Sequence, residues 1–170
     1  INNVILEIGG QQIDKHYGHW METWAQLTQK NSAGSLGVCD NNEPNESNET
    51  GTRFQNLARA GGVCMDGANN IICQVPLQFW FCRNPGLALP LIALQYHEVK
   101  TLLTFATTTT GVTLNGSVLW VDYIYLDTDE RRRFAQVSHE YLIEQVQHQS
   151  NTQTKHELNF NHPVKELIWN

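Results

Sequence analysis

Apolar residues recur at every second position near the start of the chain. Val4, Leu6 and Ile8 share one parity, and polar residues fall mainly on the other. A period of two is typical of a β-strand with one buried face. The pair Gly9-Gly10 follows at once and predicts the end of this strand.

The hydrophobic spacing changes after Asp14, which is a suitable helix cap. Beyond it, large apolar residues recur at intervals of three and four, and this spacing predicts a helix with one aromatic stripe. The stripe consists of Tyr17, Trp20, Met21, Trp24 and Leu27. A stripe at helical period is more typical of core packing than of a ligand platform, so we expect it to face the core.

A polar region separates this helix from the next apolar segment. Residues 40–51 contain no hydrophobic side chain, which predicts a long exposed loop over residues 29–62. The sequence also contains three short N-glycosylation patterns, which begin at Asn45, Asn48 and Asn115. These three asparagines are candidate glycan-bearing residues, on a pattern that also arises often by chance.

The most pronounced alternation lies at residues 71–81 and predicts a strand. Its apolar positions are Ile71, Cys73, Val75, Leu77, Phe79 and Phe81. Pro76 indicates an edge position or a bulge, because proline removes a ladder donor. Phe79 and Phe81 share the parity of their apolar neighbours, and we therefore expect both rings to point into the core between two sheets.

Two more strands and a short helix are predicted further along. The apolar segment at residues 91–106 changes phase, and a β-bulge near His97-Glu98 would reconcile its halves. Residues 118–126 alternate like a strand. Asp127, with a glutamate three residues later, resembles a capping box and predicts a helix through about Gln136.

The last part of the chain is less regular. Residues 139–149 fit the helical and the strand period equally well. A polar linker at residues 150–154 is the candidate domain boundary, and residues 156–160 and 164–169 are strand-like. Strand-like sequence at both ends of the chain favours an excerpt of a longer protein.

Composition narrows the class of protein. With 170 residues, of which 41% are hydrophobic, the chain can build a core. Its net charge of −6 argues against direct nucleic-acid binding, which needs clustered Lys and Arg. No apolar stretch approaches the ~20 residues that a membrane-spanning helix requires.

The four cysteines form no C-x-x-C pair, so structural zinc is not expected. We expect reduced thiols at all four positions. They are Cys39, Cys64, Cys73 and Cys82.

Catalytic and metal-binding patterns are incomplete. His16 and His19 have an allowed metal-ligand spacing on the predicted helix, but no third ligand accompanies them. His97 and His139 each precede a glutamate, as in zincins, and the second histidine of that motif is absent in both places. There is also no phosphate-binding loop and no nucleophile elbow. We therefore expect no cofactor, no metal and no enzymatic activity.

Several long tracts together carry a family resemblance. They are ILEIGGQQID at residues 5–14, PLQFWFCRNPGLALPLIALQYHEV at residues 76–99, YIYLDTDERRRFAQ at residues 123–136, HEYLIEQ at residues 139–145 and HPVKELIW at residues 162–169. In this order they resemble the major capsid protein of nucleocytoplasmic large DNA viruses, of the iridovirus and algal-virus type. The resemblance covers nearly the whole chain except the loop at residues 29–62.

The resemblance implies an all-β fold with short helices, a jelly-roll β-sandwich that is part of a double jelly roll. Residues 1–149 would form most of the first jelly roll without its first strands, residues 150–154 a linker, and residues 155–170 the opening of the second. It also implies that residues 139–149 are a strand after a short helix. The family has no catalytic residues to carry over.

The implied partners are structural. Three copies would form a homotrimer of pseudo-hexagonal outline, in contact with neighbouring capsomers and minor capsid proteins of an icosahedral virion capsid, which assembles in the host-cell cytoplasm. The 127–133 helix fits an inter-subunit salt-bridge site or a solvated surface equally well. This 170-residue piece alone would be insoluble or poorly folded, because its apolar edges would lack partners.

Two other classes stay open on the sequence alone. A carbohydrate-binding jelly-roll module would stack sugars on Trp20, Trp24 or Trp80, and burial of these side chains would count against it. A cupin-like metal enzyme would need several histidines and a carboxylate that converge, and the sequence gives no such set.

Overall fold

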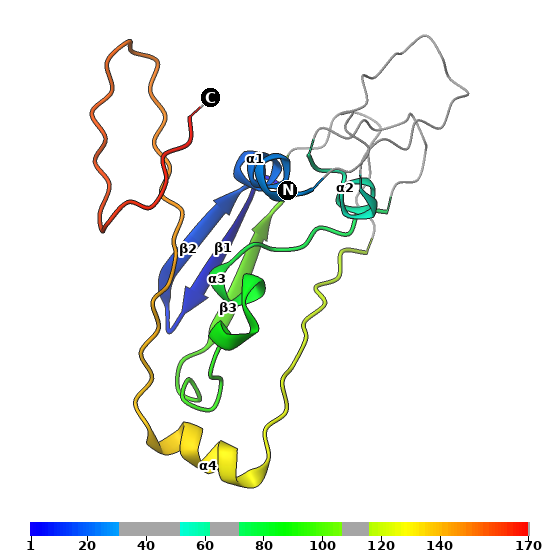
Figure 1. Cartoon of the computed structure of the whole chain (residues 1–170), viewed down its shortest axis with the longest axis vertical. Coiled ribbons are helices and arrows are strands. Elements are labelled where there is room, and N and C mark those ends of the chain that lie inside the picture. Colours follow the sequence, from blue (N-terminus) through cyan, green and yellow to red (C-terminus); the bar gives the residue numbers. More distant parts are fainter. Residues whose placement is uncertain (31–51, 62–71, 107–115, 170) are drawn as a thin grey trace.

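The computed structural model describes residues 1–30, 52–61, 72–106 and 116–169. Its elements, in chain order, are β1 (Asn3–Ile8), β2 (Gln11–Tyr17), α1 (Gly18–Thr28), α2 (Arg53–Ala58), α3 (Trp80–Arg83), the 3-10 helix η1 (Pro85–Leu87), β3 (Val99–Thr104) and α4 (Thr128–Gln136). Figure 1 shows a central sheet, α1 across one end of it, and α4 at the far end of the molecule.

The sheet is antiparallel with strand order β2-β1-β3. The first predicted strand is confirmed as β1, whose Val4 and Leu6 side chains are fully buried. Gly9 and Gly10 both have positive φ, at 60° and 82°, and they connect β1 to β2 as a two-residue hairpin. Such a turn matches the right-handed twist of the strands and favours glycine at both positions.

The predicted start of the first helix is wrong. Asp14 lies inside β2, and α1 begins at Gly18. The sheet ladder extends β2 to Tyr17, with a register shift opposite Leu6/Glu7 that keeps Asp14 on the buried face. Pairing with β1 therefore overrides the local helical spacing in this part of the chain.

The aromatic stripe of α1 is only partly buried. Met21 and Ala25 face the core, while Trp20 and Trp24 are half-buried and Leu27 is 62% exposed. The expectation that the stripe faces the core is therefore confirmed for Met21 and wrong for Leu27, because the helix crosses the sheet only with its Met21 and Ala25 side.

The loop predicted over residues 29–62 contains a helix. In α2, the Thr52 hydroxyl accepts from the backbone N–H of Gln55, and the Gln55 side chain accepts from the backbone N–H of Thr52. This capping box is a sequence-level helix signal that the polar composition of the region obscured. Gln55 is 2% exposed, so the helix is anchored by a buried amide.

The strand predicted at residues 71–81 is replaced by two other structures. Residues 72–79 run extended outside the sheet ladder, and α3 follows from Trp80. Phe79 is nevertheless 1% exposed, and Phe81 is half-buried against the same core, so the inward direction of both rings is confirmed. Trp80 is buried as well, although in a strand its side chain would point to the face opposite that of Phe79 and Phe81. The helical turn of α3 directs all three rings toward the sheet.

The phase change in residues 91–106 marks an element boundary and not a bulge. The backbone of residues 91–97 forms turns, and β3 then pairs with β1 from Val99 to Thr104 in one continuous register. The two halves of this apolar segment thus belong to different structures, and the bulge predicted near His97-Glu98 is wrong.

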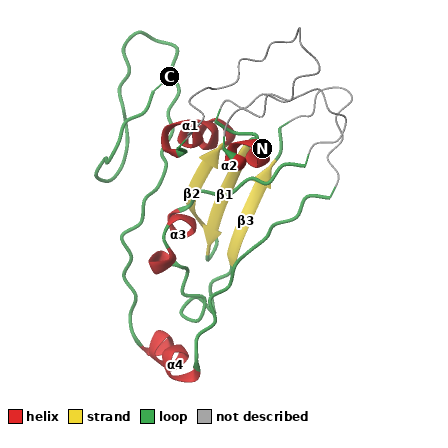
Figure 2. Cartoon of the chain, turned by 45° about the vertical axis from the view of Figure 1, so that its right-hand side comes forward, coloured by secondary structure: helices red, strands yellow, loops and turns green. Residues whose placement is uncertain are grey.

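The predicted helix over residues 127–136 is confirmed as α4, with the Asp127 carboxylate accepting from the backbone N–H of Glu130 at 2.9 Å. Extended segments lead into and out of it. Figures 1 and 2 show residues 116–127 and 137–149 on opposite sides of the sheet. Residues 139–149, which periodicity left open and which the resemblance implies to be a strand, are extended and lie beside β2, but they form no ladder with it.

Candidate functional site

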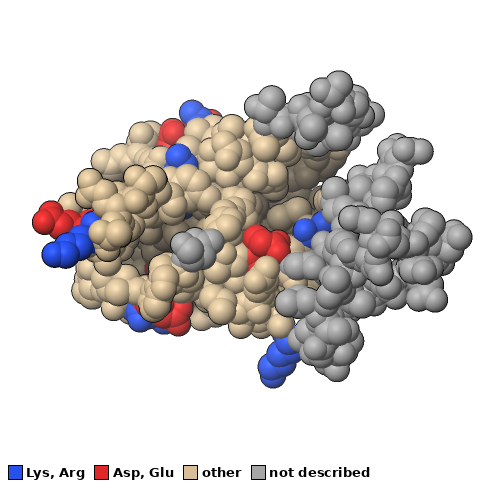
Figure 3. Space-filling view, turned by 90° about the horizontal axis from the view of Figure 1, so that it is seen from above, with Lys and Arg blue, Asp and Glu red and all other residues tan. Residues whose placement is uncertain are grey.

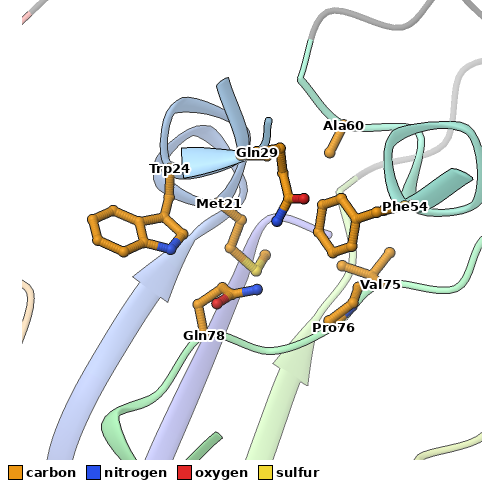
Figure 4. Close-up of a pocket in the computed structure, with 10 residues that line it drawn as sticks. Met21, Trp24, Gln29, Phe54, Ala60, Val75, Pro76 and Gln78 are labelled. Carbon is orange, nitrogen blue, oxygen red and sulfur yellow. The ribbon is translucent and has the colours of Figure 1, made fainter. Parts of the chain in front are cut away.

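A small cavity lies between α1, α2 and the extended chain near Pro76 (Figure 4). Its lining is mostly apolar and includes Met21, Phe54 and Val75. The volume of about 20 Å³ admits a single water, whereas small-molecule sites usually measure hundreds of Å³. This cavity is a packing gap beside the core and has no catalytic potential.

A buried aspartate and a buried histidine lie next to each other on β2. Asp14 and His16 are each 3% exposed, and their Oδ2 and Nε2 atoms are 2.9 Å apart. The geometry of this contact does not meet that of a hydrogen bond, and Oδ2 of Asp14 has no hydrogen-bond partner among the described residues. The His16 ring stacks on Phe79 with 4.5 Å between centroids, so the pair is packed into the core on one side.

Asp14 also joins β2 to the returning chain. Its Oδ1 atom accepts from the backbone N–H of Val146 at 3.0 Å and of Lys15 at 2.8 Å. The Gln145 side chain donates to the carbonyl oxygen of Ile13. Residues 143–149 are thus fixed to β2 by side chains in place of a backbone ladder, and the role of Asp14 is structural.

The histidine pair predicted by spacing is not brought together as a ligand set. His16 is buried on β2, while His19 lies on the exposed side of α1. His97 is exposed in a turn, and His139 stacks on Phe134 with 5.1 Å between centroids. Among the described residues, no group of three or more His, Cys, Asp or Glu side chains could hold a metal ion.

A second cluster of charges is centred on Glu144. Its Oε2 atom lies 2.7 Å from Nη2 of Arg83, and its Oε1 atom lies 2.5 Å from Nζ of Lys165. The hydrogen-bonded Lys165 ammonium, with Arg83 beside it, holds the pKa of the Glu144 carboxyl below its ordinary value. Sequence analysis missed this cluster because its members are 61 and 21 residues apart, which no local pattern can reveal.

The tryptophans proposed as a sugar platform are largely occupied by protein. Trp80 is 5% exposed and packs edge-on against Phe81. Trp20 and Trp24 lie against each other at 5.6 Å, and the Arg83 guanidinium covers Trp24 at 5.1 Å. Burial of Trp80 and the filled face of Trp24 count against the carbohydrate-binding module.

Charged residues are sparse on the face seen in Figure 3, where Lys and Arg are scattered among acidic and uncharged side chains. No continuous basic patch covers that face, as a phosphate-binding surface would require. In the described part of the chain, none of the helices has the length and apolar character needed to cross a bilayer.

Exposed apolar side chains follow the extended chain that leads to α4. Its exposed members are Val118, Leu119, Trp120, Val121, Tyr123, Ile124 and Tyr125. Trp120 is 90% exposed and Tyr125 is 93% exposed, although the two side chains have opposite parity. Such an accumulation of exposed apolar side chains is characteristic of a region that other protein covers.

The remaining candidate positions are only partly described. Cys73 and Cys82 are free thiols, as expected, and Cys39 and Cys64 lie outside the described residues. The glycan candidates Asn45, Asn48 and Asn115 also lie outside the described residues.

Comparisons with known families match almost the whole chain. The family described as major capsid protein N-terminus matches residues 1–127. The family described as large eukaryotic DNA virus major capsid protein matches residues 130–170.

Curated relatives agree with these matches. The chain is 52% identical to a major capsid protein of Pyramimonas orientalis virus, over 99% of this chain and 41% of the relative. It is 44% identical to the major capsid protein of Paramecium bursaria Chlorella virus 1, over 99% of this chain and 39% of the relative. The chain therefore spans about two fifths of the length of these relatives.

Solved structures show the same similarity. The crystal structure of PBCV-1 VP54, fitted into a reconstruction of the virophage Sputnik, matches with a TM-score of 0.57 and 42% identity, over 85% of this chain and 33% of that one. A chain of the quasi-atomic model of the PBCV-1 virus capsid matches with a TM-score of 0.56 and 41% identity, over the same shares of the two chains. The predicted all-β jelly-roll fold with short helices, part of a double jelly roll, is thereby confirmed.

Proposed function

The chain belongs to the major capsid protein family of large eukaryotic DNA viruses, and we propose that the protein it comes from trimerises into pseudo-hexagonal capsomers of an icosahedral shell. The observation that carries this proposal is the 52% identity to a major capsid protein over 99% of the chain. In the same proposal the protein resides in the virion, assembles in the host-cell cytoplasm, and contacts neighbouring capsomers and minor capsid proteins.

The exposed apolar chain before α4 supports a role in assembly. Residues 118–125 carry seven large apolar side chains that the described part of the chain leaves uncovered. A building block of a shell uses such surfaces to pack sheet against sheet and subunit against subunit. Covering them requires further strands, and the relatives are more than twice as long as this chain.

We also propose that the protein has no catalytic role. The relatives are structural capsid proteins. The buried pair Asp14 and His16 is packed between β2 and Phe79 and serves to hold the returning chain. A catalytic pair would instead need a cleft in which a substrate could reach it.

The proposed division into domains follows the sequence linker. Residues 1–149 contribute to the first jelly roll, residues 150–154 link, and residues 155–170 open the second. The linker residues are exposed, and Asn151 accepts from the backbone N–H of Gln153 in a local turn at 3.0 Å. Four hydrogen bonds cross this linker, two between Gln147 and Asn161 and two between Gln149 and residues 157 and 159, so the segments on its two sides lie next to each other.

Analytical ultracentrifugation of the purified full-length protein tests the proposal. We expect a mass three times that of one polypeptide, and negative-stain images of particles with a six-sided outline. A monodisperse monomer over the micromolar range would contradict the proposed capsomer.

A further inference from the structure

Contacts centred on the Glu144 side chain connect four segments that are distant in the sequence. The carboxylate of Glu144 contacts Arg83 at the end of α3 and Lys165 near the C-terminal end. Arg83 in turn lies over the ring of Trp24 on α1, at 5.1 Å. We propose that Glu144 is a positioning residue that holds the chain around Lys165 against α1 and α3.

The two contacts of Glu144 use different oxygen atoms. Oε2 accepts from Arg83 and Oε1 accepts from Lys165, so the two cations do not compete for one acceptor. A planar guanidinium that is also stacked on an aromatic ring has little freedom to turn. Arg83 therefore fixes the direction of the carboxylate, and the carboxylate fixes the position of Lys165.

The backbone around Glu144 is held independently of these charges. Ile143 packs against the core cluster, and the backbone N–H of Val146 donates to the buried Asp14 carboxylate. Glu144 thus projects from a fixed point beside β2. The chain around Lys165 is held less firmly: Gln147 exchanges two hydrogen bonds with Asn161 before it, while Val164 is 55% exposed and Leu167 is 53% exposed.

A groove shows where the positioned chain lies. It has a volume of about 390 Å³, and its walls are Trp24, Leu27 and Thr28 of α1 on one side and Glu166, Leu167 and Ile168 on the other. Lys165 directly precedes the second wall, and Arg83 covers the tryptophan of the first. The charge cluster is therefore connected to both walls, to the first through the contact of Arg83 with Trp24 and to the second through Lys165.

Removal of the Glu144 ion pairs should change the position of the chain around Lys165 more than the global stability of the protein. The side chains of Arg83, Glu144 and Lys165 are 29%, 46% and 71% exposed, and solvent screens ion pairs at such positions. Loss of Glu144 would leave the sheet and its core intact and release the chain around Lys165 from α1. A residue with a purely structural role in the core would instead lower the melting temperature.

The test is cross-linking across the groove in the full-length protein. Thr28→Cys and Leu167→Cys are introduced together, and the yield of a short bismaleimide bridge between them is measured by peptide mass mapping. Glu144→Gln should lower the yield at least about threefold, as expected for two coupled exposed ion pairs, at an almost unchanged melting temperature. Glu166→Gln, in the groove wall itself, is the matched control and should change the yield little.

Charge reversal separates positioning from a steric role. The triple variant Arg83→Glu, Glu144→Arg and Lys165→Glu should restore part of the bridge yield, because both ion pairs are re-formed with opposite sign while the stacking on Trp24 is lost. Lys165→Gln, which removes only the outer pair at an exposed position, should lower the yield on its own and serves if Glu144→Gln does not fold. An unchanged yield in Glu144→Gln or in Lys165→Gln, or a triple variant that stays as low as Glu144→Gln, would overturn the proposal.

Discussion

The sheet and the extended chain before α4 are both rich in apolar residues, but their surroundings are opposite. In β1, Val4 and Leu6 alternate with other residues and are fully buried. In residues 118–125 every residue except Asp122 is apolar, yet Trp120 is 90% exposed and Tyr125 is 93% exposed. The difference lies in the partners: β1 pairs with β2 on one side and with β3 on the other, whereas residues 116–127 lie outside the ladder.

This contrast shows that the apolar residues of a segment do not by themselves specify what surrounds the segment. The apolar pattern identifies the side chains that need a cover, and the cover itself comes from other segments. Each large apolar side chain gains about 1.5–3 kcal/mol when it is fully buried. Residues 118–125 therefore represent a substantial stabilisation that the described part of the chain does not realise.

The largest expected effect is the loss of solubility when residues 1–170, which contain the sheet and the extended chain before α4, are expressed without the rest of the protein. Residues 1–170 expressed alone should aggregate, because the apolar side chains of residues 118–125 and the extended chain that carries them lack partners. Light scattering after size-exclusion chromatography, with the full-length protein in parallel, measures this. A monodisperse, cooperatively melting monomer of the 170 residues would show that the exposed surface needs no cover.

Within the sheet region, Phe79→Ala should destabilise the full-length protein by about 3–5 kcal/mol through the cavity it leaves. The ring is 1% exposed and stacks on both His16 and Phe81. Tyr96→Ala is the matched control, since that ring is 87% exposed in a turn, and it should change the free energy of unfolding little. Equal effects of the two substitutions in chemical denaturation would remove the distinction between core and surface.

The junction between β2 and α1 offers a smaller perturbation. A Cβ atom on Gly18 would lie 2.2 Å from the carbonyl oxygen of Ile1, and the backbone N–H of Gly18 donates to Asn2 at 2.9 Å. Gly18→Ala should therefore force the backbone apart and cost about 1–3 kcal/mol in thermal unfolding. Gly86→Ala is the control, because its Cβ would approach only the side chain of Asn84. A Gly18→Ala protein as stable as the control would contradict the close approach.

Removal of the N-terminal cap of α4 should destabilise this helix without affecting the sheet. Asp127→Ala removes the acceptor for the backbone N–H of Glu130 and should weaken the helix by about 1 kcal/mol. Because α4 buries no side chain, faster hydrogen exchange should be confined to residues 128–136, with the sheet unaffected. Asp127→Ser keeps a capping oxygen and should retain the native exchange rate. Faster exchange that spread into β1 would show that α4 is coupled to the sheet.

The smallest effect concerns pH. The pKa of Glu144 is lower in the folded protein than its ordinary value, so the unfolded chain binds the proton more tightly. The contribution of the Glu144 carboxylate to the free energy of unfolding is therefore complete at neutral pH, which lies above the ordinary glutamate pKa. This contribution is lost as the pH falls through the lower pKa of the folded protein. The difference in unfolding free energy between the native protein and Glu144→Gln should shrink on acidification. A difference that is constant from neutral to acidic pH would contradict the ion pairs, and solvent screening keeps the whole effect small.

The sequence by itself determined the features that depend on near neighbours. The alternation of β1, the two glycines that end it and the cap of Asp127 on α4 all act within a few residues, and each formed where it was predicted. The family could also be identified, since it rests on long tracts in a fixed order. The fold class followed from that resemblance.

Only the tertiary structure decided which periodicity prevails where two compete. Asp14 joined a strand and not a helix cap, because pairing with β1 extends β2 through Tyr17. Phe79 and Trp80 are both buried because the chain turns into α3 under the sheet. Glu144 meets Arg83 and Lys165 across 61 and 21 residues of sequence. Contacts over such separations depend on where whole segments pack, and a local pattern does not contain that information.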